Sequence, residues 1–169
     1  FGDAAVRAVP PARREIFFSF RGSGRRMPLR EQILAMHNGT DRVCLDAHPH
    51  RSQLQAACEA ATGVRVPPQS DDEYVALHAR SRFSLCPRGD AVYSFRFVEA
   101  LSCGAIPVLY GDGWVLPFSE LVDYHDFAVV IAEDDVASTP KVLAAIGPAQ
   151  LEAMQRSGRR LCSSRFAAG

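Results

Sequence analysis

Arg96 and Glu99 are two charged side chains inside an otherwise apolar segment, residues 95–101 (FRFVEAL). They stand three residues apart, so they share one face of a helix that begins near Ser94. Arginine and glutamate are costly to bury unless they are paired or bind a ligand. Two interpretations remain open. The pair forms an ion pair on a solvated face, or the arginine binds a phosphate while the carboxylate accepts from two ribose hydroxyls. The apolar neighbours favour the ligand site.

Three glycine-bearing loops follow short apolar segments. They are RGSG at 21–24, PRGD at 87–90 and GDG at 111–113. In an open parallel sheet the loops after the strands meet at the carboxyl edge, where ligands bind. Glycine allows close backbone approach, and the helix N-termini that follow supply N–H donors. Arg21, Arg88 and Arg96 add positive charge, so the loops together predict a diphosphate site. Its further members are Gly22, Gly89, Gly111 and Asp112.

No single phosphate-binding motif supports this prediction. The sequence contains neither G-x-G-x-x-G nor G-x-x-x-x-G-K-[ST], so a dinucleotide fingerprint and a P-loop are both excluded. Asp112 either orients a sugar hydroxyl or only makes turn hydrogen bonds. The prediction therefore depends on three loops converging on one edge of a sheet.

Segments rich in strand formers alternate with helical patterns along the chain. Strands are expected at 15–20, 42–47, 83–86, 105–110 and 127–132, and helices from 28, at 71–81 and 94–103, from 138–140 and at 149–161. Gly104 follows the helix at 94–103 as the residue that ends it. This alternation predicts an α/β fold, a Rossmann-like parallel sheet with helices on both faces. Residues 1–14 are interpreted as a linker or boundary segment, and residues 15–169 as one domain.

Composition narrows the classes of function. The chain has 169 residues, 47% hydrophobic and 22% charged, with a formal net charge of +0. A balanced charge argues against nucleic-acid binding by counterion release. No apolar run approaches the length of a membrane span. Five cysteines without a C-x-x-C pair argue against a disulfide framework. Because the chain begins with Phe1, we expect it to be a segment of a longer protein.

Two groups of potential metal ligands were weighed. His48 and His50 form an H-x-H pair, but no third and fourth ligands are spaced nearby. The acidic run at 133–135 lies just before a helix, where compensation of the helix dipole explains it better. We therefore expect no metal site. His37 and His78 fall in helical segments and are expected at the surface.

Several spaced motifs in this chain resemble the exostosin family of glycosyltransferases. They are FSLCPRGDAVYSFRFVEALSCGAIPVL at 83–109, WVLPFSELVDYHDFAVVIAEDD at 114–135 and IGPAQLEAMQRSGRRL at 146–161, together with FRG at 20–22. The motifs occur in the family's order and cover most of residues 15–166. One departure is Cys103-Gly104-Ala105, where the family more often has Gly-Cys-Ile or Gly-Cys-Val, a difference expected to be harmless.

The resemblance implies an inverting glycosyltransferase with two Rossmann-like domains, the GT-B architecture, of which this chain is the C-terminal, donor-binding half. The donor is expected to be a UDP-sugar bound as substrate, with no cofactor or metal required. Arg21, Arg88 and Arg96 correspond to diphosphate ligands, with Ser94 donating to the same group. Glu99 corresponds to the ribose ligand. Residues 111–114 are expected near the base or the sugar.

The resemblance also sets expectations for the parts of the reaction outside this chain. The general base is expected on the N-terminal domain, so this segment alone is expected to bind donor without turnover. The acceptor is expected to be a glycan or glycoprotein, with heparan-type synthesis favoured by the LPFSELVDY segment. A Golgi or ER lumenal, single-pass type II membrane protein is implied, and homo- or hetero-oligomers are a further expectation.

Two alternatives stay open at this point. The first is a catalytically inactive exostosin-like subunit that stabilises or chaperones a partner transferase. The second is an unrelated nucleotide-binding α/β domain, such as a flavodoxin-like regulator, although this would not explain the LPFSE segment. Arg96 and Glu99 favour donor binding over the first of these alternatives.

Overall fold

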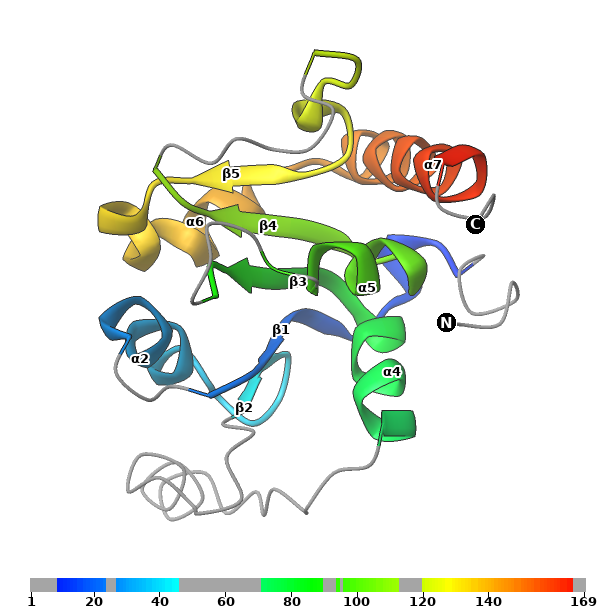
Figure 1. Cartoon of the computed structure of the whole chain (residues 1–169). Helices are drawn as coiled ribbons and strands as arrows, with labels where there is room; N and C mark the ends of the chain where they lie inside the picture. The colour runs from blue at the N-terminus through cyan, green and yellow to red at the C-terminus, as the bar shows by residue number, and fades with distance from the viewer. Residues whose placement is uncertain are drawn as a thin grey trace.

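The computed structural model describes residues 9–23, 27–45, 71–89, 94, 96–112 and 120–165, and its centre is a five-stranded sheet (Figure 1). The strands are β1 (Ile16–Arg21), β2 (Arg42–Leu45), β3 (Ser81–Pro87), β4 (Ile106–Tyr110) and β5 (Val129–Ile131). Their spatial order is β2-β1-β3-β4-β5, and every neighbouring pair is parallel. The predicted parallel sheet is confirmed. Residues 46–70, with the connection expected there, lie outside the described residues.

The strand order places a topological switch point between β1 and β3. β2 lies on one side of β1, while β3, β4 and β5 follow in sequence on the other side. The connections that leave β1 and β3 therefore run in opposite directions. In sheets of this order, ligands bind in the crevice beyond the carboxyl ends of the two strands at the switch point.

Helices cover both faces of this sheet, as predicted (Figure 1). They are α2 (Pro28–Ala35), α4 (Asp71–Arg80), α5 (Arg96–Ser102), α6 (Thr139–Ala144) and α7 (Pro148–Arg165), with 3-10 turns η1 (Pro11–Arg13), η2 (Tyr124–Asp126) and η3 (Glu133–Ser138). None of these helices in the described ranges combines the length and the apolar character that crossing a membrane requires.

The two faces of the sheet differ in chemistry because successive strand residues alternate between them. Phe83 and Leu85 of β3 join the apolar core beneath α2, α6 and the first half of α7. Ser84 and Cys86 point to the opposite face, where Ser84 meets α4 and Cys86 packs with α5. The face under α4 therefore carries buried hydroxyl groups, which need partners there.

Several element boundaries differ from the sequence prediction. Strand β3 covers Ser81–Pro87 rather than 83–86, and the bounds of β5 and α5 also change. Strand β5 covers only Val129–Ile131. Phe127 closes the η2 turn and, with Ala128, packs into the core under α5, so these two residues do not extend the strand. Helix α5 begins at Arg96 rather than Ser94. Its predicted end is confirmed, because Gly104 has φ 70° and its N–H donates to the Leu101 carbonyl.

Arg14 attaches the N-terminal segment to the sheet. Its side chain is only 2% exposed, and it donates to the carbonyls of His78 (3.3 Å), Ser81 (3.0 Å) and Cys103 (3.1 Å). Burial lowers the pKa of this guanidinium to about 10, so it stays charged at neutral pH. Carbonyls from the last turn of α4, the start of β3 and the end of α5 thus converge on one buried cation, two residues before β1.

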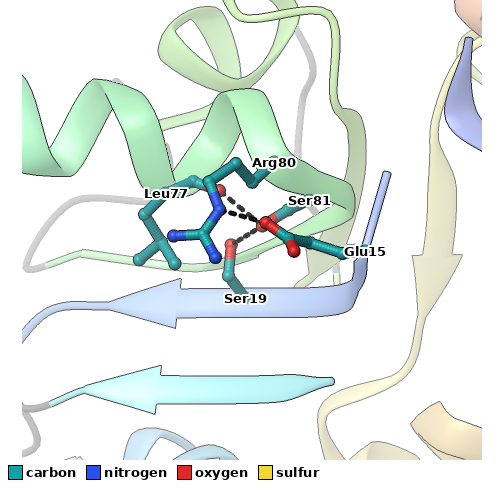
Figure 2. A network of polar contacts seen from close by, with 5 residues as sticks. All are labelled: Glu15, Ser19, Leu77, Arg80 and Ser81. Carbon is teal, nitrogen blue, oxygen red and sulfur yellow. Dashed lines mark hydrogen bonds and ion pairs between the residues drawn. The ribbon is translucent and has the colours of Figure 1, made fainter. Parts of the chain in front are cut away.

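A polar network continues from this point into the sheet, as Figure 2 shows. Ser81 Oγ donates to the Leu77 carbonyl (2.6 Å) and lies 2.8 Å from Ser19 Oγ. At the surface above it, Arg80 forms an ion pair with Glu15. The network joins the end of α4 to β1 and so fixes the helix that carries part of the candidate site.

Candidate functional site

The loops after β1 and β3 meet at the switch point through a residue that the sequence analysis did not single out. Arg30 of α2 donates from Nη1 to the Ser23 carbonyl (3.0 Å) and from Nη2 to the Arg88 carbonyl (2.8 Å). Ser23 follows β1 and Arg88 follows β3. The predicted convergence of these two loops is therefore observed. No sequence motif marks Arg30, because its partners are backbone carbonyls.

Arg96 reaches from α5 to the carboxyl end of β1. Its guanidinium carbon lies 5.1 Å from the centroid of the Phe20 ring, within range of a cation–π interaction. Its Nε is buried and has no hydrogen-bond partner among the described residues. A buried polar atom without a partner costs free energy that a bound ligand can recover. Arg96 therefore lies at the carboxyl edge of the sheet with a hydrogen-bond donor, Nε, that has no partner among the described residues.

Gly22 gives Arg96 the space to lie there. A Cβ added to Gly22 would stand 2.8 Å from Arg96 Nη2 and 2.9 Å from Phe20 Cζ, closer than real Cβ atoms come. The N–H of Gly22 is not available to a ligand, because it donates to the Leu45 carbonyl (3.0 Å) in the sheet. The contribution of this glycine is thus close approach rather than hydrogen bonding.

Glu99 does not pair with Arg96 among the described residues. The Tyr74 hydroxyl of α4 donates to Glu99 Oε2 (2.6 Å) instead, and the Arg21 guanidinium lies over the Tyr74 ring at 5.6 Å from its centroid. The i,i+3 ion pair weighed in the sequence analysis is therefore absent from this part of the structure. Burial is the main cause that raises the pKa of Tyr74, so this hydroxyl remains a donor.

His78 corrects one expectation from the sequence. It is fully buried, not at the surface, with its ring edge-to-face on Tyr74 at a centroid distance of 4.4 Å. Its Nδ1 lies 2.9 Å from Ser84 Oγ, and its Nε2 is buried without a partner among the described residues. Burial, with Arg96 and Arg21 nearby, lowers its pKa to about 3. The signal was present in the spacing of Tyr74, Leu77 and His78, which lie on one face of α4.

Arg88 lies in a different environment from the other two predicted arginines. Its Nε forms an ion pair with Glu133 Oε1 of η3 at 2.9 Å. The two residues line a pocket of about 320 Å³ at the carboxyl edge, beside the start of α2. The other residues that line it are Met27, Pro28, Leu29, Gln32 and Asp134. The three predicted arginines thus have different partners, since Arg21 lies over Tyr74, Arg96 lies over Phe20 and Arg88 pairs with Glu133.

Comparison with known proteins gives this site a family context. Residues 5–146 match the profile of the Exostosin GT47 domain. This chain belongs to the exostosin family. It is 33% identical over 156 residues to the Exostosin-1 homolog of Caenorhabditis elegans, covering 88% of this chain and 40% of that protein. It is 30% identical to Exostosin-1c of Danio rerio over 165 residues, covering 95% of this chain and 22% of that protein. The chain therefore spans less than half of these relatives.

Solved structures agree with this assignment at the level of the fold. The C-terminal domain of a glycosyl transferase group 1 family protein (LpcC) from Francisella tularensis superposes with a TM-score of 0.57 at 11% identity, covering 94% of this chain and 98% of that domain. AviGT4, a glycosyltransferase involved in avilamycin A biosynthesis, superposes with a TM-score of 0.51 at 19% identity, covering 90% of this chain and 50% of that one. The predicted GT-B domain fold is confirmed.

The remaining predicted site residues of this exostosin domain lie around the same edge. Ser94 lies two residues before the start of α5 and is half-buried, with its carbonyl accepting from Phe97 N–H (3.2 Å). Gly89 and Gly111 are half-buried after β3 and β4, and Asp112 is exposed. Residues 90 and 113–114 lie outside the described residues. The edge is therefore lined by residues of all three predicted loops.

Metal ligands do not assemble in the described ranges. No group of three or more His, Cys, Asp or Glu side chains there is placed to hold a metal ion. His48, His50 and Cys58 lie outside these ranges. Cys44, Cys86, Cys103 and Cys162 are buried thiols that take part in no disulfide. Burial raises the pKa of the Cys86 thiol to about 12, so it is protonated and unreactive at neutral pH.

Proposed function

We propose that this exostosin-family domain binds the nucleoside diphosphate part of a UDP-sugar at the switch point and takes part in inverting transfer of the sugar to a glycan acceptor. The observation that carries the proposal is Arg96. Its guanidinium is half-buried at the carboxyl ends of β1 and β3, has no ion pair among the described residues, and holds a buried, unpartnered Nε. An anion of high charge density would complete it.

The chemistry of transfer explains why a fixed cation belongs there. The leaving group is a nucleoside diphosphate whose negative charge grows in the transition state. A guanidinium held in place before the reaction stabilises that charge without reorganisation. Phe20 and Gly22 hold Arg96 in this position through the contacts described above. Arg21, one strand residue before Gly22, adds charge on the same side.

Glu99 is proposed to bind the ribose. Its carboxylate is half-buried, and one oxygen accepts from Tyr74 while further lone pairs remain for hydroxyl groups. A carboxylate of this kind accepts from two vicinal hydroxyls, which the ribose of a nucleotide presents. Arg96 and Glu99 lie one helical turn apart on α5, so diphosphate and ribose would bind beside each other.

The other parts of the reaction are proposed to lie outside this chain. Inverting transfer needs a general base that deprotonates the acceptor hydroxyl. We place it on an N-terminal domain across the cleft from the carboxyl edge. Heparan-type polymers are the proposed acceptor class, because the curated relatives above are exostosin-1 proteins. We also propose, from the same resemblance, a lumenal Golgi or ER location with a type II anchor elsewhere in the protein.

Titration calorimetry with UDP tests the donor proposal. We expect the chain to bind UDP, and Arg96→Ala to weaken binding by about 1.5–3 kcal/mol, the scale of a charged hydrogen bond. Arg156→Ala is the matched control, because Arg156 is an exposed arginine on α7 paired with Glu152. No heat of binding at millimolar UDP, or equal affinity of the Arg96 and Arg156 variants, would contradict the proposal.

A further inference from the structure

The i,i+3 spacing of Arg96 and Glu99 favours an ion pair that would compete with diphosphate binding. Oppositely charged side chains at i,i+3 on a helix attract each other, and in a partly buried site this attraction is less screened than in water. Contact between them would occupy the guanidinium that the proposed function needs for the diphosphate. In the described structure they form no ion pair, so another group holds them apart.

Tyr74 is the residue that holds Glu99. Its hydroxyl donates to Glu99 Oε2 at 2.6 Å, a short bond of the charge-assisted kind. Its ring is itself fixed from two sides, by the Arg21 guanidinium at 5.6 Å and by the His78 ring at 4.4 Å. His78 is locked in turn by Ser84 of β3. A tyrosine held this firmly by α4 and the sheet can fix the carboxylate on the neighbouring helix.

Arg96 is held on the other side of the same pair. Its guanidinium is over the Phe20 ring and beside Gly22, while its Nε remains unpartnered among the described residues. The two charges are thus drawn to different anchors, one on α4 and one on β1. Neither anchor neutralises the arginine, because an aromatic ring and a glycine carry no formal charge.

We propose that Tyr74 is a positioning residue of the donor site, which holds Glu99 away from Arg96 and so keeps the guanidinium open for the diphosphate. This inference rests on the proposed function. It assigns Tyr74 no contact with the nucleotide. Its effect on UDP binding depends entirely on the carboxylate of Glu99. A double-mutant cycle with Glu99 can therefore detect this role.

The test is a double-mutant cycle of UDP binding. Tyr74→Phe keeps the ring against Arg21 and His78 but releases Glu99, which then pairs with Arg96. We expect the Kd for UDP to rise on the order of tenfold, the scale of one charge-assisted hydrogen bond. In a Glu99→Gln background no carboxylate is released, so adding Tyr74→Phe should change the Kd by less than about twofold.

Tyr124→Phe is the matched control, since it removes one hydroxyl from a buried aromatic cluster with Phe97 and Phe127. Its Kd should equal that of the unchanged chain. An unchanged Kd in Tyr74→Phe, or an equal rise in both backgrounds, would overturn the positioning role. Failure of the unchanged chain to bind UDP would instead overturn the proposed function, so the two failures are distinguishable.

Discussion

Arginines that the sequence predicted for one diphosphate lie in two corners of the carboxyl edge. The partners of these arginines differ between the two corners. In the Arg88 corner, formed by Arg30, Arg88 and Glu133, the charged groups have partners within the chain. Arg88 pairs with Glu133, and Arg30 donates to two loop carbonyls. In the Arg96 corner, formed by Arg21, Tyr74, Arg96 and Glu99, the arginines lie on aromatic rings and Glu99 accepts from a neutral hydroxyl.

The difference in partners indicates which arginines stabilise the fold and which one is free to bind an anion in the proposed function. A cation already paired with a carboxylate must exchange one anion for another when a phosphate arrives, which yields little net free energy. Arg96 lies over the Phe20 ring and has no ion pair among the described residues, so it needs no such exchange. Arg30 in the Arg88 corner joins the loops after β1 and β3. In the proposed function, Arg96 is the residue that binds the diphosphate.

Removing the two arginines in turn gives the largest expected contrast. Arg96→Ala should weaken UDP binding by about 1.5–3 kcal/mol, as a charged hydrogen bond would. Arg88→Ala should weaken it by less than about 1 kcal/mol, because Arg88 is half exposed and paired with Glu133. Calorimetry on both variants checks the order, and a larger loss in Arg88→Ala would reverse the assignment of the two corners.

Filling the space beside Arg96 should disturb the same corner without removing a charge. Gly22→Ala places a Cβ against Arg96 and Phe20, so we expect about 1–3 kcal/mol of lost stability together with weaker UDP binding. Gly147→Ala is its control, since nothing lies within 4 Å of a Cβ there. Denaturant unfolding and UDP titration of both variants measure the difference. Equal behaviour of the two would show that Gly22 is not required for close approach.

The pH dependence of stability should report the buried histidine behind the Arg96 corner. The pKa of His78 is lowered to about 3 in the fold, chiefly by burial, whereas an unfolded histidine has a pKa near 6.5. Between these values the unfolded chain binds the extra proton. The contribution of His78 to the free energy of unfolding is therefore complete above pH 6.5. It falls as the pH drops, by at most about 1.4 kcal/mol per pH unit.

His78→Gln should flatten this part of the stability curve. Urea unfolding between pH 4.5 and 7.5 of the unchanged chain and of this variant gives the difference in slope. His125→Gln, at an exposed position, is the control and should retain the slope of the unchanged chain. Identical slopes for all three proteins would show that His78 is not buried in its neutral form.

The smallest effect is expected from the partner of Arg88. Glu133→Gln removes an ion pair whose arginine is 49% exposed and whose glutamate is 24% exposed. The free energy of unfolding should change by less than about 1 kcal/mol, as for other surface ion pairs. UDP affinity should rise slightly, since Arg88 loses its competing anion. A fall in affinity, measured in the same titration, would instead place Glu133 in the donor site.

The sequence predicted the strand and helix pattern well because the strands are short and apolar, and glycine or proline marks an end of β1, β3 and β4. The loops at 21–24 and 87–90 were placed at one edge by the parallel topology alone. Tyr74 and Arg30 were missed for a common reason. Their partners are a side chain 25 residues away and backbone carbonyls, and tertiary contacts of this kind leave no local motif.

The partners of the charged side chains also could not be predicted from the sequence. Spacing brought Arg96 and Glu99 to one helical face, but it could not show that α4 supplies a hydroxyl to one and β1 an aromatic ring to the other. Similarly, the run at 133–135 suggested compensation of a helix dipole, whereas Glu133 forms an ion pair with a residue after β3. Both differences arise from neighbours that only the assembled sheet brings together.

A crystal structure of the chain with UDP tests the central claim most directly. The account predicts a phosphate oxygen within hydrogen-bonding distance of the Arg96 guanidinium, at the carboxyl ends of β1 and β3. It also predicts the ribose at Glu99, with the Tyr74 bond intact. A nucleotide whose phosphates contact only the Arg88 corner, with Arg96 still unpartnered over Phe20, would contradict the account.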